Sequence, residues 1–221
     1  MFSYGCKEAA LETYLLARDL NGVPVGRHQF FVILTGNSQQ AFRLQHSNQT
    51  LVSRKIGQHY GLVLGAQNVK SSAQSSTKFN RLIFVPFEHA DFSCAIEYFG
   101  GAPSILSGQF GYKKAEAKRV MPKNGYTETQ LGLAILSAID FYIVNESNQP
   151  IAYPPPWLGK NSNSWTNSIL DVVPAELPNG SKARQKHADF NGADAAHDVR
   201  IHQMYFKGLC NPCTVQNPAY R

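Results

Sequence analysis

Charged residues are scarce in this 221-residue sequence, and no apolar run is long enough to span a bilayer. Only 16% of the residues are charged while 43% are hydrophobic, which excludes the composition of a disordered protein. The segment from Met1 to Glu8 has no basic start followed by an apolar stretch, so a Sec-type signal peptide is not expected. We therefore expect a soluble protein without a transmembrane segment, made in the cytoplasm and exported, if at all, by a non-Sec route.

Cysteine is also rare, with four residues, of which only Cys210 and Cys213 lie close together. A zinc site needs a second pair of ligands at suitable spacing, and a thioredoxin-type redox motif should open a helix after a strand. This pair instead sits in a proline-containing tail, so we interpret the cysteines as structural or incidental. A disulfide stays open for a protein that works outside the cytoplasm. No metal and no cofactor are expected.

The formal net charge of +6 favours acidic partners in general, such as nucleic acid, anionic lipid or the bacterial wall with its anionic polymers. The charge is not concentrated, however, because the densest basic run, from Lys113 to Arg119, includes Glu116. This run is typical of a solvated loop or helix face, and no recognised nucleic-acid motif accompanies it. Nucleic acid is therefore not expected as a partner.

A chain of this length fits one large domain, with a core at about residues 12 to 177 and an irregular extension from 178 to 221. Turn-bounded β-prone segments predict strands, and apolar residues at helical spacing predict two helices, the first preceded by Thr127 as N-cap. The predicted strands are 28–34, 40–46, 59–67 and 81–87, and the predicted helices are 128–145 and 161–170. These elements predict an α+β fold in which an antiparallel sheet packs against helices.

The first two predicted strands form a plausible hairpin that places two histidines opposite each other. If the turn centres on Asn37, positions that sum to 74 face each other, so His28 pairs with His46. A second histidine could then orient the first. His46 is therefore the predicted third member of a catalytic site, with Gln45, His59 and Glu88 as competing candidates.

The predicted helix that starts at Asn161 offers a place for a nucleophile. The first turn of a helix carries unsatisfied N–H groups and the positive end of the macrodipole, which acidify a nucleophile and stabilise a nearby oxyanion. A strand histidine such as His28 can serve as the general base. A structural interpretation stands beside this one, because Asn161, Ser162 and Ser164 are all residues that favour helix N-caps.

Two short motifs together resemble a known group of hydrolases. The run Gly26-Arg27-His28-Gln29-Phe30-Phe31-Val32, followed much later by Asn161-Ser162-Asn163-Ser164-Trp165, resembles the permuted papain-fold families, including NlpC-like and LRAT-like proteins. In those families a histidine precedes the nucleophile, and an Asn-Cys pair typically opens the nucleophile helix. The layout also resembles effectors of bacterial type VI secretion, which carry no signal peptide.

The resemblance implies a permuted papain-like fold with Ser162 in the nucleophile position and His28 as general base. Asn161 and Asn163 would then lie at the oxyanion or substrate side of the site. One departure matters, because Ser162 stands where those families have Cys, and a thiolate forms far more readily than an alkoxide. Ser162 is accordingly a working nucleophile, a lost one, or a Cys-to-Ser change made to trap a complex.

The leading functional prediction is an amidase or peptidase that acts on peptidoglycan peptides as an antibacterial toxin. Such an effector would work in the periplasm of a target cell, with an immunity protein and a component of the secretion machinery as partners. A second interpretation is an LRAT-like acyl hydrolase or transferase, with Phe30, Phe31 and Trp157 lining an acyl groove. A third is a catalytically inactive binding or adaptor domain, favoured by the serine at the cysteine position.

Overall fold

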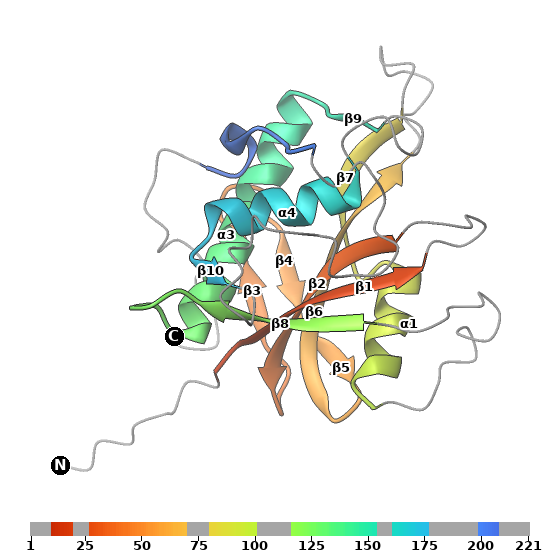
Figure 1. The fold of residues 1–221 in the computed structure, drawn as a ribbon, viewed down its shortest axis with the longest axis vertical. Helices are drawn as coiled ribbons and strands as arrows, with labels where there is room; N and C mark the ends of the chain where they lie inside the picture. The colour runs from red at the N-terminus through yellow and green to blue at the C-terminus, as the bar shows by residue number, and fades with distance from the viewer. Residues whose placement is uncertain are drawn as a thin grey trace.

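The computed structural model describes residues 10–19, 27–69, 80–100, 116–153, 161–176 and 199–207 (Figure 1). Its strands are β1 (Glu12–Asp19), β2 (Arg27–Gly36), β3 (Ala41–Arg43), β4 (Thr50–Val52), β5 (Arg54–Ile56), β6 (His59–Val69), β7 (Asn80–Pro86), β8 (Glu116–Pro122), β9 (Ala152–Tyr153) and β10 (Ala175–Glu176). Its helices are α1 (His89–Tyr98), α3 (Glu128–Asn148), α4 (Ser162–Val172) and the 3-10 turn η3 (Gln203–Tyr205). The predictions that concern Trp157, Cys210 and Cys213, and most of the predicted C-terminal extension, lie outside the described residues.

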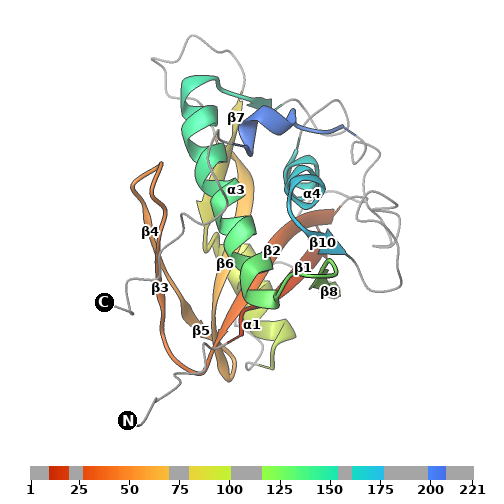
Figure 2. The ribbon, with the colours of Figure 1, turned by 90° about the vertical axis from the view of Figure 1, so that its left-hand side faces the viewer.

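The described strands form one curled antiparallel sheet in the order β10-β8-β1-β2-β6-β7-β9, with β5 also paired to β6. Strands β3 and β4 make a separate two-stranded sheet, which stands beside α3 in Figure 2. The predicted α+β fold, with an antiparallel sheet packed against helices, is therefore confirmed at this level.

Helix α3 begins where the sequence predicts. The Thr127 side chain accepts from the main-chain N–H of Gln130, and the Gln130 side chain accepts from the N–H of Thr127, so both members of a capping box are present. Leu131, Ile135 and Ile139 follow at helical spacing and are fully buried.

Among the described residues no helix combines the length and the apolar character needed to cross a membrane.

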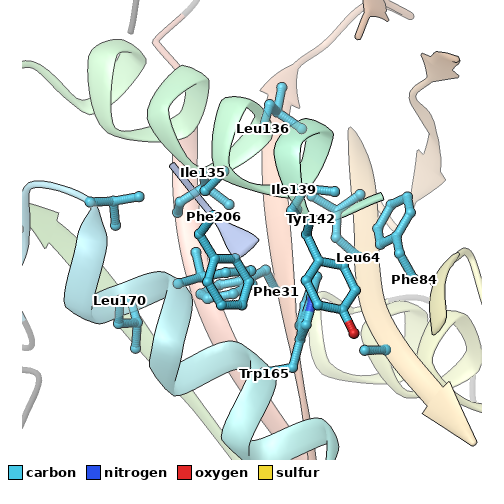
Figure 3. Packing of buried hydrophobic residues seen from close by; sticks show 14 of the residues in the cluster. Phe31, Leu64, Phe84, Ile135, Leu136, Ile139, Tyr142, Trp165, Leu170 and Phe206 are labelled. Atoms are coloured by element: carbon cyan, nitrogen blue, oxygen red, sulfur yellow. The ribbon is translucent and has the colours of Figure 1, made fainter. Parts of the chain in front are cut away.

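Strand β2 is apolar on both faces because helices cover the sheet on both sides. Its odd-numbered residues Phe31 and Ile33 join the larger core cluster, which includes Trp165 of α4 and Tyr142 of α3. Figure 3 shows Phe31, Tyr142 and Trp165 packed between these two helices and the sheet. The even-numbered residues of β2 face the other way, toward a smaller cluster that contains Cys94 and Ala95 of α1. Side chains of β2 thus alternate between the α4 side and the α1 side.

The predicted hairpin between residues 28–34 and 40–46 is wrong. Strand β2 pairs with β1 and β6, whereas β3 pairs with β4. A long strand that is buried on both faces needs long partners on both edges, and the three-residue β3 cannot supply one. The residue directly opposite His28 on β1 is Arg18, not His46.

The predicted solvated loop or helix face at residues 113–119 is also wrong for its described part. Glu116 begins strand β8, which pairs with β1 from Ala17↔Glu116 to Thr13↔Val120. Two charged residues of this strand form ion pairs, Arg119 with Glu128 at 2.6 Å and Glu116 with Arg27 at 2.9 Å. The strand is only partly buried, which is why its composition looks like that of a solvated segment.

Candidate functional site

The sheet opens into a fork where β2 and β6 stop pairing. The last registered pair is Phe31 with Leu64. Strand β2 nevertheless begins at Arg27, and β6 continues to Val69, where it is paired with β7. Figure 1 shows the end of β6 turning away from the start of β2. This opening, between residues 27–30 and residues 65–69, is called the β2–β6 fork below.

Four polar side chains meet on the α1 side of the fork. Arg18 of β1, His28 of β2 and Gln67 of β6 come from three adjacent strands, and Asp91 comes from the first turn of α1. Asp91 Oδ1 lies 2.6 Å from Arg18 Nε, and Asp91 Oδ2 lies 3.0 Å from His28 Nε2 and 2.9 Å from Gln67 Nε2. Asp91 is fully buried, and Arg18 and His28 are nearly so. These four residues are called the Asp91 cluster below.

Hydrogen-bond chemistry determines which ring nitrogen of His28 carries the proton. Gln67 Nε2 lies 2.9 Å from both His28 Nε2 and Asp91 Oδ2, so three atoms form a tight triangle. A carboxylate oxygen only accepts and an amide nitrogen only donates. If His28 Nε2 carried a lone pair and accepted from Gln67, that lone pair would also face the Asp91 carboxylate, and two acceptors would then lie 3.0 Å apart without a proton between them. We therefore assign the proton to Nε2, which donates to Asp91 and leaves the lone pair on Nδ1.

Asp91 stays ionised because its partners outweigh its burial. Burial alone raises the pKa of the Asp91 carboxyl, but the His28 ring and then the Arg18 guanidinium lower that pKa below its ordinary value of 3.8. Arg18 also lies 3.5 Å from Glu88. The Glu88 side chain caps α1 by accepting from the N–H groups of Ala90 and Asp91. Arg18 thus ties the first turn of α1 to the sheet beside His28.

Gly65 of β6 leaves the space that the cluster occupies. A Cβ atom at this position would lie 2.7 Å from Asp91 Oδ2 and 3.6 Å from His28 Nε2. Real Cβ atoms essentially never approach another heavy atom within 3.0 Å. A residue other than glycine would therefore push Asp91 away from the ring.

Cys94 lies one helical turn after Asp91 and is buried in the cluster that includes Phe30 and Val63. Burial raises the pKa of the Cys94 thiol to about 12. Because the thiolate is the nucleophilic form, a thiol with this pKa is almost wholly protonated near neutral pH. Cys94 is accordingly a packing residue and does not replace the cysteine that the resembling families carry at position 162.

The first turn of α4 is capped in the way its sequence predicts. Asn161 Oδ1 accepts from the Ser164 N–H at 3.0 Å, and Ser164 Oγ accepts from the Asn161 N–H at 3.2 Å. Trp165 is fully buried and starts the apolar face of the helix. The predicted role of Asn161 and Ser164 in capping the N-terminus of α4 is therefore confirmed.

Asn163 joins α4 to the strand on both sides of His28. Its Oδ1 accepts from the Gln29 N–H at 2.9 Å, and its Nδ2 donates to the Arg27 carbonyl at 2.8 Å. These are main-chain groups that a neighbouring strand would otherwise bind, so the Asn163 amide takes the place of β6 at the fork. Both ends of the amide are occupied, and Asn163 thus acts as a clamp between the helix and the strand.

Ser162 is the first residue of α4 and is only 4% exposed. Helix α4 packs on the odd-numbered side of β2, where Thr166 Oγ1 donates to Gln29 Oε1 at 3.1 Å, whereas the His28 ring faces α1. In the part of the chain that is described, no hydrogen bond joins the Ser162 hydroxyl to His28. The structure brings the start of α4 to the strand around His28 without directly joining the two predicted reactive groups.

His46 takes no part in the Asp91 cluster. It lies in the turn between β3 and β4, where its N–H donates to Asp140 Oδ2 at 2.9 Å and its ring stacks on Phe141 of α3. The competing candidates Gln45 and His59 are exposed. Glu88, the remaining candidate, contacts Arg18 and caps α1 rather than touching His28.

Asp91, the carboxylate that holds His28, is not among the residues predicted from the sequence, because it lies on helix α1, which was not predicted. The signal for that helix was present. Glu88 precedes it as an acidic N-cap, and Asp91 lies in its first turn, where the helix dipole favours negative charge. No local pattern, however, connects position 91 to position 28.

Comparison with protein-family models, with curated proteins and with solved structures found no match, so similarity assigns no family to this chain. Within the described ranges, no group of three or more His, Cys, Asp or Glu side chains is arranged to hold a metal ion.

Proposed function

We propose that this protein is a hydrolase of permuted papain-like fold that cleaves amide bonds, with Ser162 as nucleophile, His28 as general base and Asp91 as the orienting carboxylate. One observation carries the proposal. Asn163, the neighbour of Ser162, forms hydrogen bonds to the main chain of Arg27 and Gln29, the residues on either side of His28. The His28 ring is in turn hydrogen-bonded to the buried Asp91 carboxylate. A nucleophile, a base and a group that orients the base are the parts that covalent catalysis needs.

In the proposed reaction, the Ser162 hydroxyl attacks the substrate carbonyl carbon and gives its proton to His28 Nδ1. The tetrahedral intermediate then collapses, and His28 passes that proton to the leaving amine, which leaves an acyl group on Ser162. A water molecule attacks the acyl group with His28 again as base, releasing the acid and restoring the serine. Asp91 keeps the ring oriented throughout and stabilises its charged form.

The proposal requires the Ser162 hydroxyl to reach Nδ1 through the β2–β6 fork when substrate is bound. The fork supports this route because it is the place where β2 has no registered partner on the β6 side. Apo geometries of catalytic groups are often looser than those of their substrate complexes. The developing oxyanion would be stabilised by main-chain N–H groups at the start of α4 rather than by Asn163, whose amide is engaged.

As the substrate we propose a peptide of bacterial peptidoglycan. The net charge of +6 supports an anionic polymer as the surrounding target, although it does not select the scissile bond. An effector of this kind would act in the periplasm of a target cell, with an immunity protein as its partner. These points rest on the resemblance of the two motifs to secreted effectors.

The proposal is tested by digesting purified peptidoglycan and analysing the released muropeptides. We expect the natural sequence to release new muropeptides, and His28→Ala and Ser162→Ala to abolish that release. His59→Ala is the matched control, because His59 is an exposed strand histidine outside the cluster. Equal release by the His28→Ala variant would remove the proposal.

A second candidate is a catalytically inactive domain that binds a partner. Two observations favour it: serine stands at the position where the resembling families carry cysteine, and no hydrogen bond in the described residues connects that serine to His28. Ser162→Cys separates the candidates. Hydrolysis gained only in that variant would favour a lost or engineered nucleophile, whereas hydrolysis by the unmodified sequence would reject the inactive domain.

A further inference from the structure

In the described part of the chain, Arg18 is the only Lys or Arg residue that forms an ion pair with Asp91. It lies directly opposite His28 in the β1–β2 register, and its side chain is only 8% exposed. Its Nε lies 2.6 Å from Asp91 Oδ1, on the far side of the carboxylate from the ring.

The charges around this pair define what Arg18 does. Asp91, in the first turn of α1, and Glu88, the N-cap of that helix, are carboxylates within ion-pair distance of Arg18. Gln67 of β6 is neutral, Cys94 of α1 is kept protonated by its raised pKa, and Arg27 of β2 is paired with Asp19 and Glu116. A buried carboxylate beside an imidazole favours the protonated ring, which cannot accept a proton from a nucleophile. A guanidinium on the other oxygen of that carboxylate offsets this preference.

We propose that Arg18 is a positioning residue that acts through Asp91, fixing the carboxylate against His28 while sharing its charge so that the ring is free to serve as a base. The inference rests on the proposed function, because it gives the ring that role. It differs from a purely structural role in what it predicts. Replacing a purely structural arginine would affect only the stability of the fold, whereas the proposed role predicts that replacing Arg18 also moves the pH dependence of the reaction.

The experiment compares Arg18→Met, which removes the charge, with Arg18→Lys, which keeps it. Arg81→Met is the matched control, because Arg81 pairs with the buried Glu146 through Nε and Nη2 at 3.0 and 2.7 Å, away from His28. Two quantities are measured for each protein: the pH profile of kcat/KM in peptide hydrolysis, and the pH at which the ¹⁵N signals of the His28 ring change in NMR spectra. The NMR measurement needs no activity.

We expect Arg18→Met to move the acid limb of the profile and the NMR midpoint upward by about one pH unit, which is about a tenfold loss of kcat/KM on that limb. Arg18→Lys should retain most of the natural behaviour, and Arg81→Met should lower the melting temperature without moving either midpoint. If Arg18→Met does not fold, Glu88→Gln replaces it, since removing this carboxylate leaves more of the Arg18 charge to Asp91 and should move the midpoint downward.

An NMR midpoint that is unchanged in Arg18→Met, or in Glu88→Gln where that variant is used, would overturn the inference. The two proposals can fail separately. A shifted midpoint without any hydrolysis would sink the proposed function and leave the Arg18 relationship standing. Hydrolysis with an unchanged NMR midpoint would leave the proposed function standing and contradict the role of Arg18.

Discussion

Gly65 leaves no room for a side chain beside Asp91, because a Cβ atom there would lie 2.7 Å from Asp91 Oδ2. Gly65 thereby permits a carboxylate on helix α1 to reach a histidine on strand β2. Asp91 is held by Arg18 as well as by the ring, so it cannot move aside without breaking a second interaction. The hydrogen bond between Asp91 and the His28 ring therefore depends on this packing.

The first prediction concerns Gly65→Ala. We expect hydrolysis to fall at least tenfold and the free energy of unfolding to fall by about 1–3 kcal/mol, because the added methyl group overpacks the Asp91 cluster. Gly132→Ala is the control, since Gly132 lies in α3 and a Cβ there would meet the Leu11 side chain, 2.9 Å from its Cδ1 and 3.2 Å from its Cβ, and not a residue of the Asp91 cluster. Gly65→Ala with full activity would show that the cluster does not need its observed geometry.

The second prediction concerns the pH dependence of stability. The folded pKa of Asp91 lies below its ordinary value of 3.8, so Asp91 binds its proton more weakly in the folded than in the unfolded protein. Its contribution to stability is therefore fully present above about pH 4 and is lost as the pH falls through the lower, folded pKa. Urea unfolding followed between pH 6 and pH 3 should show this loss.

Asp91→Asn should remove that part of the acid dependence and lower the free energy of unfolding at pH 7 by about 3 kcal/mol or more, because the buried Arg18 loses its shorter ion pair, which is 2.6 Å long. Asp171→Asn provides the comparison, since Asp171 pairs with Arg200 at 2.9 Å in a more exposed place. Equal effects of the two substitutions would contradict the special role of Asp91.

These electrostatic relationships mark the limit of what the sequence could predict. The α+β class, helix α3 with its Thr127 cap and the buried strand β2 all follow from local pattern, since capping and periodicity act over a few residues. Pairing does not. β2 joins β1 and β6 rather than the nearby β3, because burial on both faces favours long partners over close ones in sequence.

The site shows the same division. His28 and the Asn161 cap are recognisable from short motifs, and the structure gives both a clear hydrogen-bonding role. The partner of His28 is 63 positions away on a helix that local pattern did not reveal, and the wrong hairpin suggested His46 in its place. Ser162 stays a prediction: it opens the helix that Asn163 ties to the strand of His28, but in the described residues no hydrogen bond joins its hydroxyl to the ring.

The third prediction separates the two asparagines of α4. Asn163→Ala removes both bonds to the main chain around His28 and leaves a buried N–H and a buried carbonyl unpaired, which costs about 1–3 kcal/mol for each group. Asn161→Ala removes a helix cap, which costs about 1 kcal/mol. Chemical denaturation should therefore rank Asn163→Ala as clearly the more harmful. The reverse ranking would mean that the clamp does not hold α4 to the strand.

The fourth prediction concerns Cys94. In a variant whose other three cysteines are replaced by serine, we expect no alkylation by iodoacetamide at pH 8 in the folded protein, because burial raises the pKa of the Cys94 thiol to about 12. The same thiol should react fully after unfolding in urea. Peptide mass spectrometry measures the alkylation of Cys94 in the folded and in the unfolded protein. Rapid alkylation of the folded protein would show that the Cys94 thiol is reactive and would make it a candidate nucleophile.

The most direct test of the central claim is covalent labelling of Ser162. A fluorophosphonate reacts with a serine hydroxyl only where a neighbouring base activates it, so the adduct reports the nucleophile and base without any assumption about substrate. Mass spectrometry should find one adduct, on Ser162, that is lost in His28→Ala and retained in His59→Ala. Absence of the adduct from the natural sequence, or an equal yield in His28→Ala, would contradict the account.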